Sequence, residues 1–292
     1  MKGIILSGGT ATRLFPLSKA ISKQIMPVYD KPMIYYPLSS LMLCGIRDIL
    51  IISTPRDLPC FRELLGDGAQ LGLRLSYKVQ EVANGLAQAL VLAEDFLQGD
   101  GCCLILGDNL FYGQGFSGML EKAKKRVDEG GAVIFGYYVR DPRAYGVAEI
   151  SQDGKVISLE EKPSVPKSHY AVPGLYFYDH TGVEKAKSLK PSARGEYEIT
   201  DLNNLYLKEG SLYLEPFGRG FAWLDTGNAD SLLEASNFVA TVQRRQGFYI
   251  SCVEEIAWRK GWITSRDLFQ LGLQMGKTAY GAYLMELSGE KL

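Results

Sequence analysis

The sequence predicts an α/β fold: a Rossmann-like, mixed and mostly parallel central sheet flanked by helices, with β-hairpin insertions and a helical C-terminal appendage. Two observations support the prediction. In the first two-thirds of the chain, short apolar runs alternate with segments of helical spacing, which is typical of strands and helices in an α/β sheet. Closely spaced strand-like runs with turn residues follow, and the last part of the chain has a helical pattern.

The first part supplies the alternating elements. Strand-like runs cover residues 2–7, 48–53, 73–79, 102–106 and 132–139, and helical spacing covers 35–44, 85–97 and 117–129. The first strand ends directly at a glycine-rich turn, and the fully apolar run 102–106 ends at Gly107-Asp108. Such alternation predicts a mostly parallel sheet with helices on both faces.

The pattern then changes to hairpins and shorter strands. Residues 145–150 and 155–160 flank Asp153-Gly154 and predict a β-hairpin. Further strands are expected at 171–178, 211–216 and 221–224, and a helix at 199–209. Beyond Asn228 the chain is helical in pattern nearly to its end. We therefore expect an α/β core over residues 1–227 and a helical segment over residues 228–292 within the same compact unit.

Composition excludes several function classes. A formal net charge of −1 on 292 residues offers no overall field for nucleic acid or an acidic membrane. The apolar run Ile4–Leu6 is too short for a signal peptide, and no run approaches the roughly 18 apolar residues of a spanning helix. Five cysteines without paired spacing indicate free thiols in a reducing cytoplasm, and two histidines are too few for a histidine-built metal site.

The turn after the first strand, SGGTATRL at residues 7–14, has the composition of a phosphate-binding loop. Glycines let backbone N–H groups approach a phosphate, and Arg13 adds a planar charged fork. The spacing matches neither the dinucleotide-binding nor the P-loop motif, which disfavours a dehydrogenase or a P-loop NTPase. An ordinary strand-to-helix turn is the alternative. Lys23 could add a second positive charge, although alone it would be an ordinary surface lysine.

Two aspartates follow strand-like runs. Asp108 comes directly after 102–106, and Asp225 closes the run at 221–224. Ligands bind at the carboxyl ends of strands in open α/β sheets, and Mg²⁺ prefers few carboxylates together with phosphate and water. Either aspartate alone could equally be a turn or cap residue.

The segments GGTATRL and SKQIMPVYDKPMIYYPLSSLM closely resemble the nucleotidyltransferases that make nucleotide-sugars. NGLAQAL, LGDNLFYG, RAYGVAEI, LEEKP, VPGLYFYD, GEYEITDLN and WLDTG continue the resemblance in order, from Met1 to about Trp262. Each motif is weak to moderate by itself, but the ordered set is specific. The resemblance implies Mg²⁺-dependent transfer from dTTP to glucose 1-phosphate, which gives dTDP-glucose and pyrophosphate and begins dTDP-deoxysugar synthesis. It also implies a homotetramer.

The resemblance assigns residues within the 1–227 core. Nucleotide binding falls to Gly8, Gly9, Thr10, Ala11, Thr12, Arg13, Lys23, Gln24, Gln80, Gly85, Leu86 and Asp108. The sugar 1-phosphate falls to Asn109, Tyr145, Gly146, Glu161, Lys162, Val172, Tyr176, Arg194 and Trp223. Catalytic roles fall to Arg13, Lys23, Asp108, Lys162 and Asp225, with Asp108 and Asp225 on one or two metals. Simpler alternatives are an exposed Gln80, a surface Glu161–Lys162 ion pair, and core positions for Tyr176 and Trp223.

Two positions depart from the family pattern. Ala11 stands where a glycine is usual, and an alanine with positive φ would cost roughly 1 kcal/mol or more. We expect weaker nucleotide binding or a shifted loop there. Pro173 replaces a small polar residue, with an effect that the sequence leaves open.

Three alternatives to thymidylyl transfer remain at this stage. They are UTP or another sugar 1-phosphate as substrate, a non-catalytic nucleotide-sugar sensor, and an NAD-dependent oxidoreductase, which the glycine spacing opposes. A base pocket around Gln80 and Leu86 should exclude purines, whereas dTTP and UTP differ by one methyl group. The segment 251–258 resembles the family's tail, which supports oligomer contacts and an allosteric site. A packed amphipathic helix fits that segment equally well.

Overall fold

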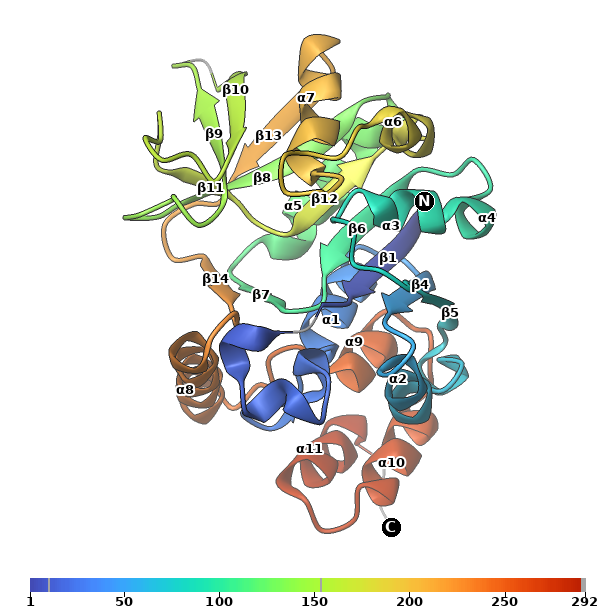
Figure 1. Cartoon of the computed structure of the whole chain (residues 1–292). Coiled ribbons are helices and arrows are strands. Elements are labelled where there is room, and N and C mark those ends of the chain that lie inside the picture. The colour runs from blue at the N-terminus through green and yellow to red at the C-terminus, as the bar shows by residue number, and fades with distance from the viewer. Residues whose placement is uncertain (10, 153, 290–292) are drawn as a thin grey trace.

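The computed structural model describes residues 1–9, 11–152 and 154–289, and its centre is one large mixed sheet (Figure 1). Along the sheet the strand order is β10-β9-β11-β8-β12-β6-β1-β4-β5, with β13 also paired to β8. The strands are β1 (Lys2–Ser7), β4 (Asp48–Ser53), β5 (Arg74–Val79), β6 (Cys102–Leu106), β8 (Ala132–Tyr138), β9 (Gly146–Ile150), β10 (Val156–Glu161), β11 (Tyr170–Val172), β12 (Leu175–Tyr178) and β13 (Leu212–Pro216).

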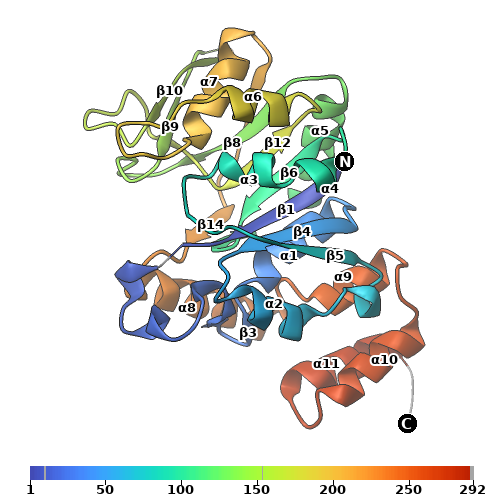
Figure 2. The same cartoon turned by 45° about the vertical axis from the view of Figure 1, so that its right-hand side comes forward.

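Helices cover both faces of this sheet (Figures 1 and 2). They are α1 (Tyr35–Leu43), α2 (Leu58–Leu65), α3 (Gln88–Leu92), α4 (Glu94–Leu97), α5 (Phe116–Asp128), α6 (Gly182–Ser188), α7 (Ile199–Lys208), α8 (Ala229–Gln246), α9 (Val253–Arg259), α10 (Ser265–Gln274) and α11 (Ala279–Ser288). Buried side chains of α1, α2, α5 and α9 share one apolar core, and those of α3, α6 and α7 share another. The predicted α/β class is therefore confirmed.

Strand β1 shows why the sheet has two cores. Ile5 packs into the core of α1 and α5, whereas Ile4 and Leu6 pack into the core of α3 and α7. Successive strand residues point to opposite faces, so a strand covered on both sides must be apolar throughout. The uninterrupted apolar runs in the sequence reflect this double burial.

The sheet direction places several strand ends at one edge. β1 runs parallel to both β4 and β6, and β5 continues parallel to β4. β12 then runs antiparallel between β6 and β8. The carboxyl ends of β1 and β6 therefore lie side by side, which is where open α/β sheets bind ligands.

Two sequence predictions about elements were wrong in detail. The expected strand 171–178 is two strands, β11 and β12, separated by Pro173-Gly174. Both pair with β8, but on the other side β11 pairs with β9 and β12 with β6. Proline has no N–H to donate to a ladder, and a Cβ on Gly174 would lie 2.5 Å from Leu106. The expected helix 85–97 begins only at Gln88, because Gly85 has a φ of 106°, and it is divided into α3 and α4.

Some elements were not predicted at all. These are helices α2 and α6 and strand β7 (Asn109–Tyr112). The strand expected at 221–224 is present as β14 (Ala222–Asp225), but its pairing with β7 in a small separate sheet was not predicted. Of the predicted hairpin, β9 and β10 are paired as expected, while Asp153 in its turn lies outside the described residues.

The chain beyond Asn228 is helical, as predicted, and forms α8 to α11. Asn228 begins α8 with a capping box in which its side chain accepts from the Ser231 N–H. Helices α10 and α11 pack together at the end farthest from β9 and β10 (Figure 1). In the part of the chain that the structure describes, no helix is long and apolar enough to cross a membrane. The division at residue 227 remains a prediction.

Candidate active site

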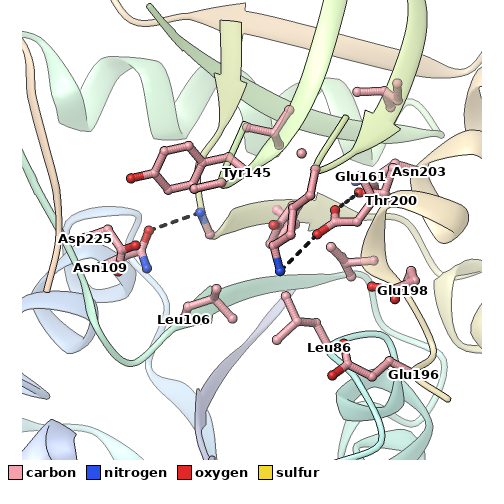
Figure 3. A pocket seen from close by; sticks show the side chains of 18 of the residues that line it. Leu86, Leu106, Asn109, Tyr145, Glu161, Glu196, Glu198, Thr200, Asn203 and Asp225 are labelled. Carbon is pink, nitrogen blue, oxygen red and sulfur yellow. Dashed lines mark hydrogen bonds and ion pairs between the residues drawn. The ribbon is translucent and has the colours of Figure 1, made fainter. Parts of the chain in front are cut away.

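Two adjoining cavities open at the carboxyl ends of β1 and β6. The larger cavity encloses about 300 Å³ and the smaller cavity about 200 Å³. The residues that line both are Leu86, Leu106, Asp108 and Glu196. In Figure 3, Asn109 and Asp225 lie at one end of the larger cavity and Glu196 and Glu198 at the other. The shared wall leaves room for one molecule that has one end in each cavity and its middle beside Asp108.

The turn after β1 forms one wall of the smaller cavity. Gly8 and Gly9 line it, and Gly9 has a φ of 94°. Ala11 also has a left-handed backbone, with φ 46° and ψ 42°. The condition under which alanine costs roughly 1 kcal/mol is therefore met at this position.

Two other predicted residues of this loop that the structure describes are not seen in the cavity walls. Ala11 and Thr12 do not belong to the described lining of either cavity, although the Ser18 hydroxyl holds the loop by donating to the Ala11 carbonyl at 2.7 Å. Thr10, which was predicted to bind nucleotide, lies outside the described residues.

Arg13 points toward the other cavity. It lies in a short 3₁₀ helix, Thr12–Leu14, and lines the larger cavity. A Cβ added to Gly227 would lie 3.2 Å from Arg13 Nη2, so the guanidinium packs against this glycine. Arg13 therefore brings its charge to the Asp225 end of the larger cavity.

Lys23 is buried rather than at the surface. Only 8% of it is exposed, and its Nζ forms an ion pair with Asp108 Oδ2. The adjacent Gln24 is also buried and lines the smaller cavity, and the Ser22 hydroxyl donates to its Oε1 at 2.7 Å. A lysine ammonium out of water needs a partner, and Asp108 provides it. The surface-lysine alternative is therefore wrong for Lys23.

The two predicted metal-binding aspartates lie close enough to repel each other. Pairing of β14 with β7 sets Asp225 opposite Asn109, beside Asp108. Burial and the negative charge of Asp108 raise the pKa of Asp225 to about 6, although Lys23 and Arg13 act in the opposite direction. The Thr226 hydroxyl ties the two segments together by donating to the Asp108 carbonyl at 3.0 Å.

This pair suits a hard divalent cation. Mg²⁺ is typically held by one or two carboxylates together with substrate phosphates and water. Within residues 1–9, 11–152 and 154–289, no group of three or more His, Cys, Asp or Glu side chains is arranged to hold a metal. A site made by Asp108 and Asp225 therefore needs further oxygen ligands from a substrate, which fits a phosphate-bearing one.

The smaller cavity is mostly uncharged. Its Gln80 side chain is buried, and Nε2 donates to Gln88 Oε1 at 2.7 Å. Gln80 is therefore not the exposed polar residue of the simpler alternative. Leu86 and Ala83 add apolar wall, and Ala83 was missed by the sequence analysis. Besides its positive φ, a close contact requires glycine at position 85, because a Cβ there would lie 2.5 Å from the Tyr197 carbonyl oxygen.

The larger cavity gathers every residue that was predicted for the sugar 1-phosphate. These are Asn109, Tyr145, Gly146, Glu161, Lys162, Val172, Tyr176, Arg194 and Trp223. Tyr176 and Trp223 are also buried in the apolar cores, as the simpler alternative expects, and their contact with a sugar stays a prediction. The sequence motifs thus converge on one space, although the role of each residue remains a proposal.

The Asn109 amide is engaged with protein groups on both sides. Its Oδ1 accepts from Trp223 Nε1 at 2.6 Å and from the Gly174 N–H at 3.1 Å. Its Nδ2 donates to Asp108 Oδ1 at 2.9 Å. Asn109 therefore orients Asp108 as well as lining the cavity.

Glu161 and Lys162 form both an ion pair and a cavity wall. Lys162 Nζ lies 3.6 Å from Glu161 Oε1, and about half of the Lys162 side chain is exposed. Lys162 has a φ of 43°, and its N–H donates to the Tyr145 carbonyl at 3.0 Å. The Thr200 hydroxyl donates to Glu161 Oε2 at 2.6 Å (Figure 3). This positive φ at a charged cavity residue is a strained conformation of the kind often found at functional sites.

Several cavity residues were missed in the sequence. Glu196, Glu198, Thr200 and Asn203 line the larger cavity. All of them belong to or directly flank the segment GEYEITDLN, whose dense acidic residues after Arg194 were a usable signal. Other residues that were missed are Leu106, Ala144, Leu159, Gly174 and Ile199.

A separate cavity of about 430 Å³ adjoins the C-terminal helices. It lies between residues 111–117 and the segment 248–259, and its wall includes Ser251, Cys252, Glu255, Ile256 and Arg259. The segment 251–258 therefore lines a partly open cavity and also contributes to the packed helix α9.

Comparisons with known proteins agree with this geometry. A family model described as nucleotidyl transferase matches residues 2–242. A glucose-1-phosphate thymidylyltransferase from Neisseria gonorrhoeae is 56% identical over 290 residues, which cover 99% of this chain and 100% of that protein. One from Xanthomonas campestris pv. campestris (strain B100) is 57% identical over 287 residues, or 98% of this chain and 97% of that protein.

A solved structure is similar as well. It is a crystal structure from Bacillus anthracis, assigned as a glucose-1-phosphate thymidylyltransferase in complex with sucrose. It superposes with a TM-score of 0.76 at 43% sequence identity and covers 82% of this chain and 94% of that chain. Sequence and fold therefore point to the same family.

Proposed function

Since this chain belongs to the nucleotidyl transferase family, we propose that its two cavities carry out thymidylyl transfer from dTTP to glucose 1-phosphate, which gives dTDP-glucose and pyrophosphate. The observation that carries the proposal is the junction at Asp108, where a glycine- and amide-lined cavity meets a charged one. This nucleotide-sugar is a starting point for dTDP-deoxysugar synthesis.

In this proposal the smaller cavity holds the nucleotide. Gln24 and Gln80 offer amide groups to a pyrimidine edge, and Leu86 offers an apolar contact. Gly8 and Gly9 allow backbone N–H groups to approach the phosphates.

The larger cavity then holds the sugar 1-phosphate. Lys162 and Arg194 supply positive charge for the phosphate, and the Glu161 carboxylate can accept sugar hydroxyl groups. Tyr145 and Trp223 provide flat apolar walls, with ring centroids 4.9 Å apart. Polar groups fix the orientation of the sugar, and the aromatic rings exclude water from it.

The chemistry joins two anions. An oxygen of the sugar 1-phosphate attacks the α-phosphorus of dTTP, a new P–O bond forms, and the bond to the leaving pyrophosphate breaks. A phosphate monoester has its second pKa at about 6, so at neutral pH it is largely a dianion and needs no base to remove a proton. Arg13, Lys23 and Lys162 offset the repulsion between the two anions and stabilise charge in the transition state. Positioning and charge therefore carry the catalysis.

Members of this family generally use a divalent metal. We propose Mg²⁺, held by Asp108 and Asp225 and completed by phosphate oxygens and water. When bound, the metal supplies charge that draws the two phosphate groups together. The Lys23 ammonium already forms an ion pair with Asp108, so a positive charge of the protein itself lies at the proposed metal site.

Three further properties belong to the proposal. We propose a cytoplasmic location, since Cys44, Cys102, Cys103 and Cys252 are buried free thiols. We propose a homotetramer and a regulatory role for the C-terminal cavity on the resemblance of its segment to the family tail. The cavity volume of about 430 Å³ supports the regulatory role, because it is large enough for a small-molecule effector.

The test is a substrate panel. The protein is incubated with Mg²⁺, glucose 1-phosphate and each nucleoside triphosphate in turn, and pyrophosphate release is followed. We expect release with dTTP, weaker release with UTP and almost none with ATP or GTP. Release only with another sugar 1-phosphate would keep the mechanism and change the substrate. Binding of dTTP without release for any pair would support the sensor alternative.

A further inference from the structure

The guanidinium of Arg194 is held by one carboxylate in a fork-to-fork arrangement. Arg194 Nη2 lies 2.8 Å from both Glu198 Oε1 and Glu198 Oε2, and Arg194 Nε lies 3.1 Å from Oε1. Such planar pairs fix the direction of the guanidinium as well as its place. About 43% of the Arg194 side chain is exposed, so without this partner a long flexible chain would move freely at the cavity wall.

Glu198 is itself fixed. It is 8% exposed, and the Ser192 hydroxyl donates to its Oε1 at 2.7 Å. It is the residue before the first turn of α7, with φ −72° and ψ 134°, where the positive end of a helix favours a negative charge. The carboxylate therefore stays in place while Arg194 depends on it.

The backbone around Glu198 is anchored on the opposite side. The Tyr197 N–H donates to the Asn84 carbonyl at 2.7 Å, and the Ala87 N–H donates to the Tyr197 carbonyl at 3.1 Å. Asn84 and Ala87 flank the segment that lines the smaller cavity. The loop that carries Arg194 is thus joined to the wall of the neighbouring cavity, which leaves Glu198 little freedom to follow a moving arginine.

Because of the charges near Arg194, the two possible roles of Glu198 predict opposite changes in phosphate binding when Glu198 is neutralised. Arg194 Nη2 also lies 3.5 Å from Glu161 Oε1 and 3.7 Å from Glu196 Oε2, so carboxylates outnumber the guanidinium here. A glutamate that acted only as a nearby negative charge would repel a phosphate, and its removal would tighten anion binding. A glutamate that positions Arg194 has the opposite effect.

We propose that Glu198 is a positioning residue that holds the Arg194 guanidinium at the wall of the larger cavity for the phosphate of the incoming sugar 1-phosphate. The inference rests on the proposed function. In this arrangement Glu198 acts on the phosphate through Arg194 rather than directly. It sets the geometry of the residue that binds the phosphate.

The first experiment compares Glu198→Gln with the wild type. Glutamine keeps the volume but loses the charge-assisted fork, so we expect the KM for glucose 1-phosphate to rise about tenfold and the KM for dTTP to change by less than about twofold. The matched control is Glu215→Gln, which breaks a similar ion pair with Lys122, 2.8 Å long, outside both cavities. An unchanged or lower KM for glucose 1-phosphate in Glu198→Gln would overturn the proposal.

A double-mutant cycle separates positioning from general damage. If Glu198 acts through Arg194, the variant with both Arg194→Ala and Glu198→Gln should be no worse than Arg194→Ala alone. If the double variant instead raised the KM by the product of the two single increases, the proposal would be contradicted. Ser192→Ala removes the hydroxyl that donates to Glu198 and accepts from the Arg194 N–H at 3.2 Å, and it should raise the same KM about threefold.

Calorimetric binding of glucose 1-phosphate keeps the two proposals distinguishable. It needs no turnover, so weaker binding to Glu198→Gln than to the wild type would support the positioning role even if dTTP proved not to be the nucleotide. Equal binding by both proteins, with the fold of each checked by thermal unfolding, would overturn the positioning role while leaving thymidylyl transfer intact.

Discussion

The two cavities differ in how they are built. The smaller cavity is lined by glycines and amides, with Asp108 and Glu196 as its charged members. The larger cavity is lined by Arg13, Lys162 and Arg194 among several carboxylates. A nucleobase is neutral and flat, so shape and amide contacts suffice for it, whereas a phosphate requires charge. The difference predicts that charge changes act on turnover and the sugar 1-phosphate, and that steric changes act on the nucleotide.

The largest expected effect lies where the cavities meet. Asp225→Asn keeps the shape of the side chain but removes one of the two facing carboxylates. We expect a loss of turnover of about 10²–10³-fold, comparable to the removal of a preorganised electrostatic group. Pyrophosphate release measures this loss, and Mn²⁺ binding followed by electron paramagnetic resonance should weaken in parallel. Unchanged Mn²⁺ binding would remove Asp225 from the metal site.

The same substitution should increase stability near neutral pH. Burial and Asp108 raise the pKa of Asp225 to about 6, so the native state binds this proton more tightly than the unfolded state does. This group therefore lowers the free energy of unfolding as the pH rises through the window from about 4 to 6. We expect Asp225→Asn to have a Tm about 2 °C higher than the wild type at pH 7.5, and no advantage below pH 4. A lower Tm at pH 7.5 would contradict the stated repulsion.

The next effect separates two cations of the larger cavity. Lys162→Ala should raise the KM for glucose 1-phosphate by about 10- to 100-fold, because it removes a charge that meets the substrate in the ground state. Arg13→Ala should mainly lower kcat, because Arg13 lies beside the Asp225 carboxylate at the reacting end. Steady-state kinetics with each substrate varied will tell them apart. Small and equal changes in both parameters would count against both assignments.

A steric change should act on the nucleotide side. Gly85→Ala combines a φ of 106° with a Cβ 2.5 Å from the Tyr197 carbonyl oxygen, so the segment must shift. We expect the KM for dTTP to rise about tenfold, with a smaller change for glucose 1-phosphate. Gly210→Ala is a suitable control, since it has a positive φ of 70° but no atom within 4 Å of the added Cβ. If both variants behaved alike, general backbone strain would explain the result.

The smallest effect concerns Ala11. Ala11 has a φ of 46°, and glycine at this position removes a backbone strain of roughly 1 kcal/mol. Glycine also increases the conformational entropy of the unfolded chain, which opposes this gain in stability. We expect dTTP affinity to improve by a few fold, as measured by calorimetry. Equal affinity and activity in the two proteins would reject the idea that this alanine weakens the loop.

The sequence predicted the sheet better than its interruptions. Runs such as 2–7 and 48–53 are apolar because both faces of these strands are covered, and that pattern is local. The division of 171–178 depends on Pro173, which cannot donate to a ladder, and on the close approach of Gly174 to Leu106, which is a contact between strands. The short helices α2 and α6 have few turns in which periodicity could appear.

For the candidate site, too, local motifs were predicted and long-range contacts were not. Residues within distinctive motifs, such as Lys23 and Asp108, were placed in advance, and the structure pairs them directly. The burial of Lys23 could not be predicted, since an isolated lysine gives no sign of an aspartate 85 positions away. Glu198 was missed because the role proposed for it depends on its partner Arg194, although the acidic residues that follow Arg194 in the sequence were a usable signal for the cavity wall.

The most direct test of this account is a crystal structure of the protein with dTDP-glucose and Mg²⁺. We expect the thymine ring beside Gln80 and Leu86, the glucose beside Glu161 and Lys162, and the diphosphate at Asp108, between the two cavities. A product bound entirely within one cavity, or with sugar and base exchanged between the two, would contradict it.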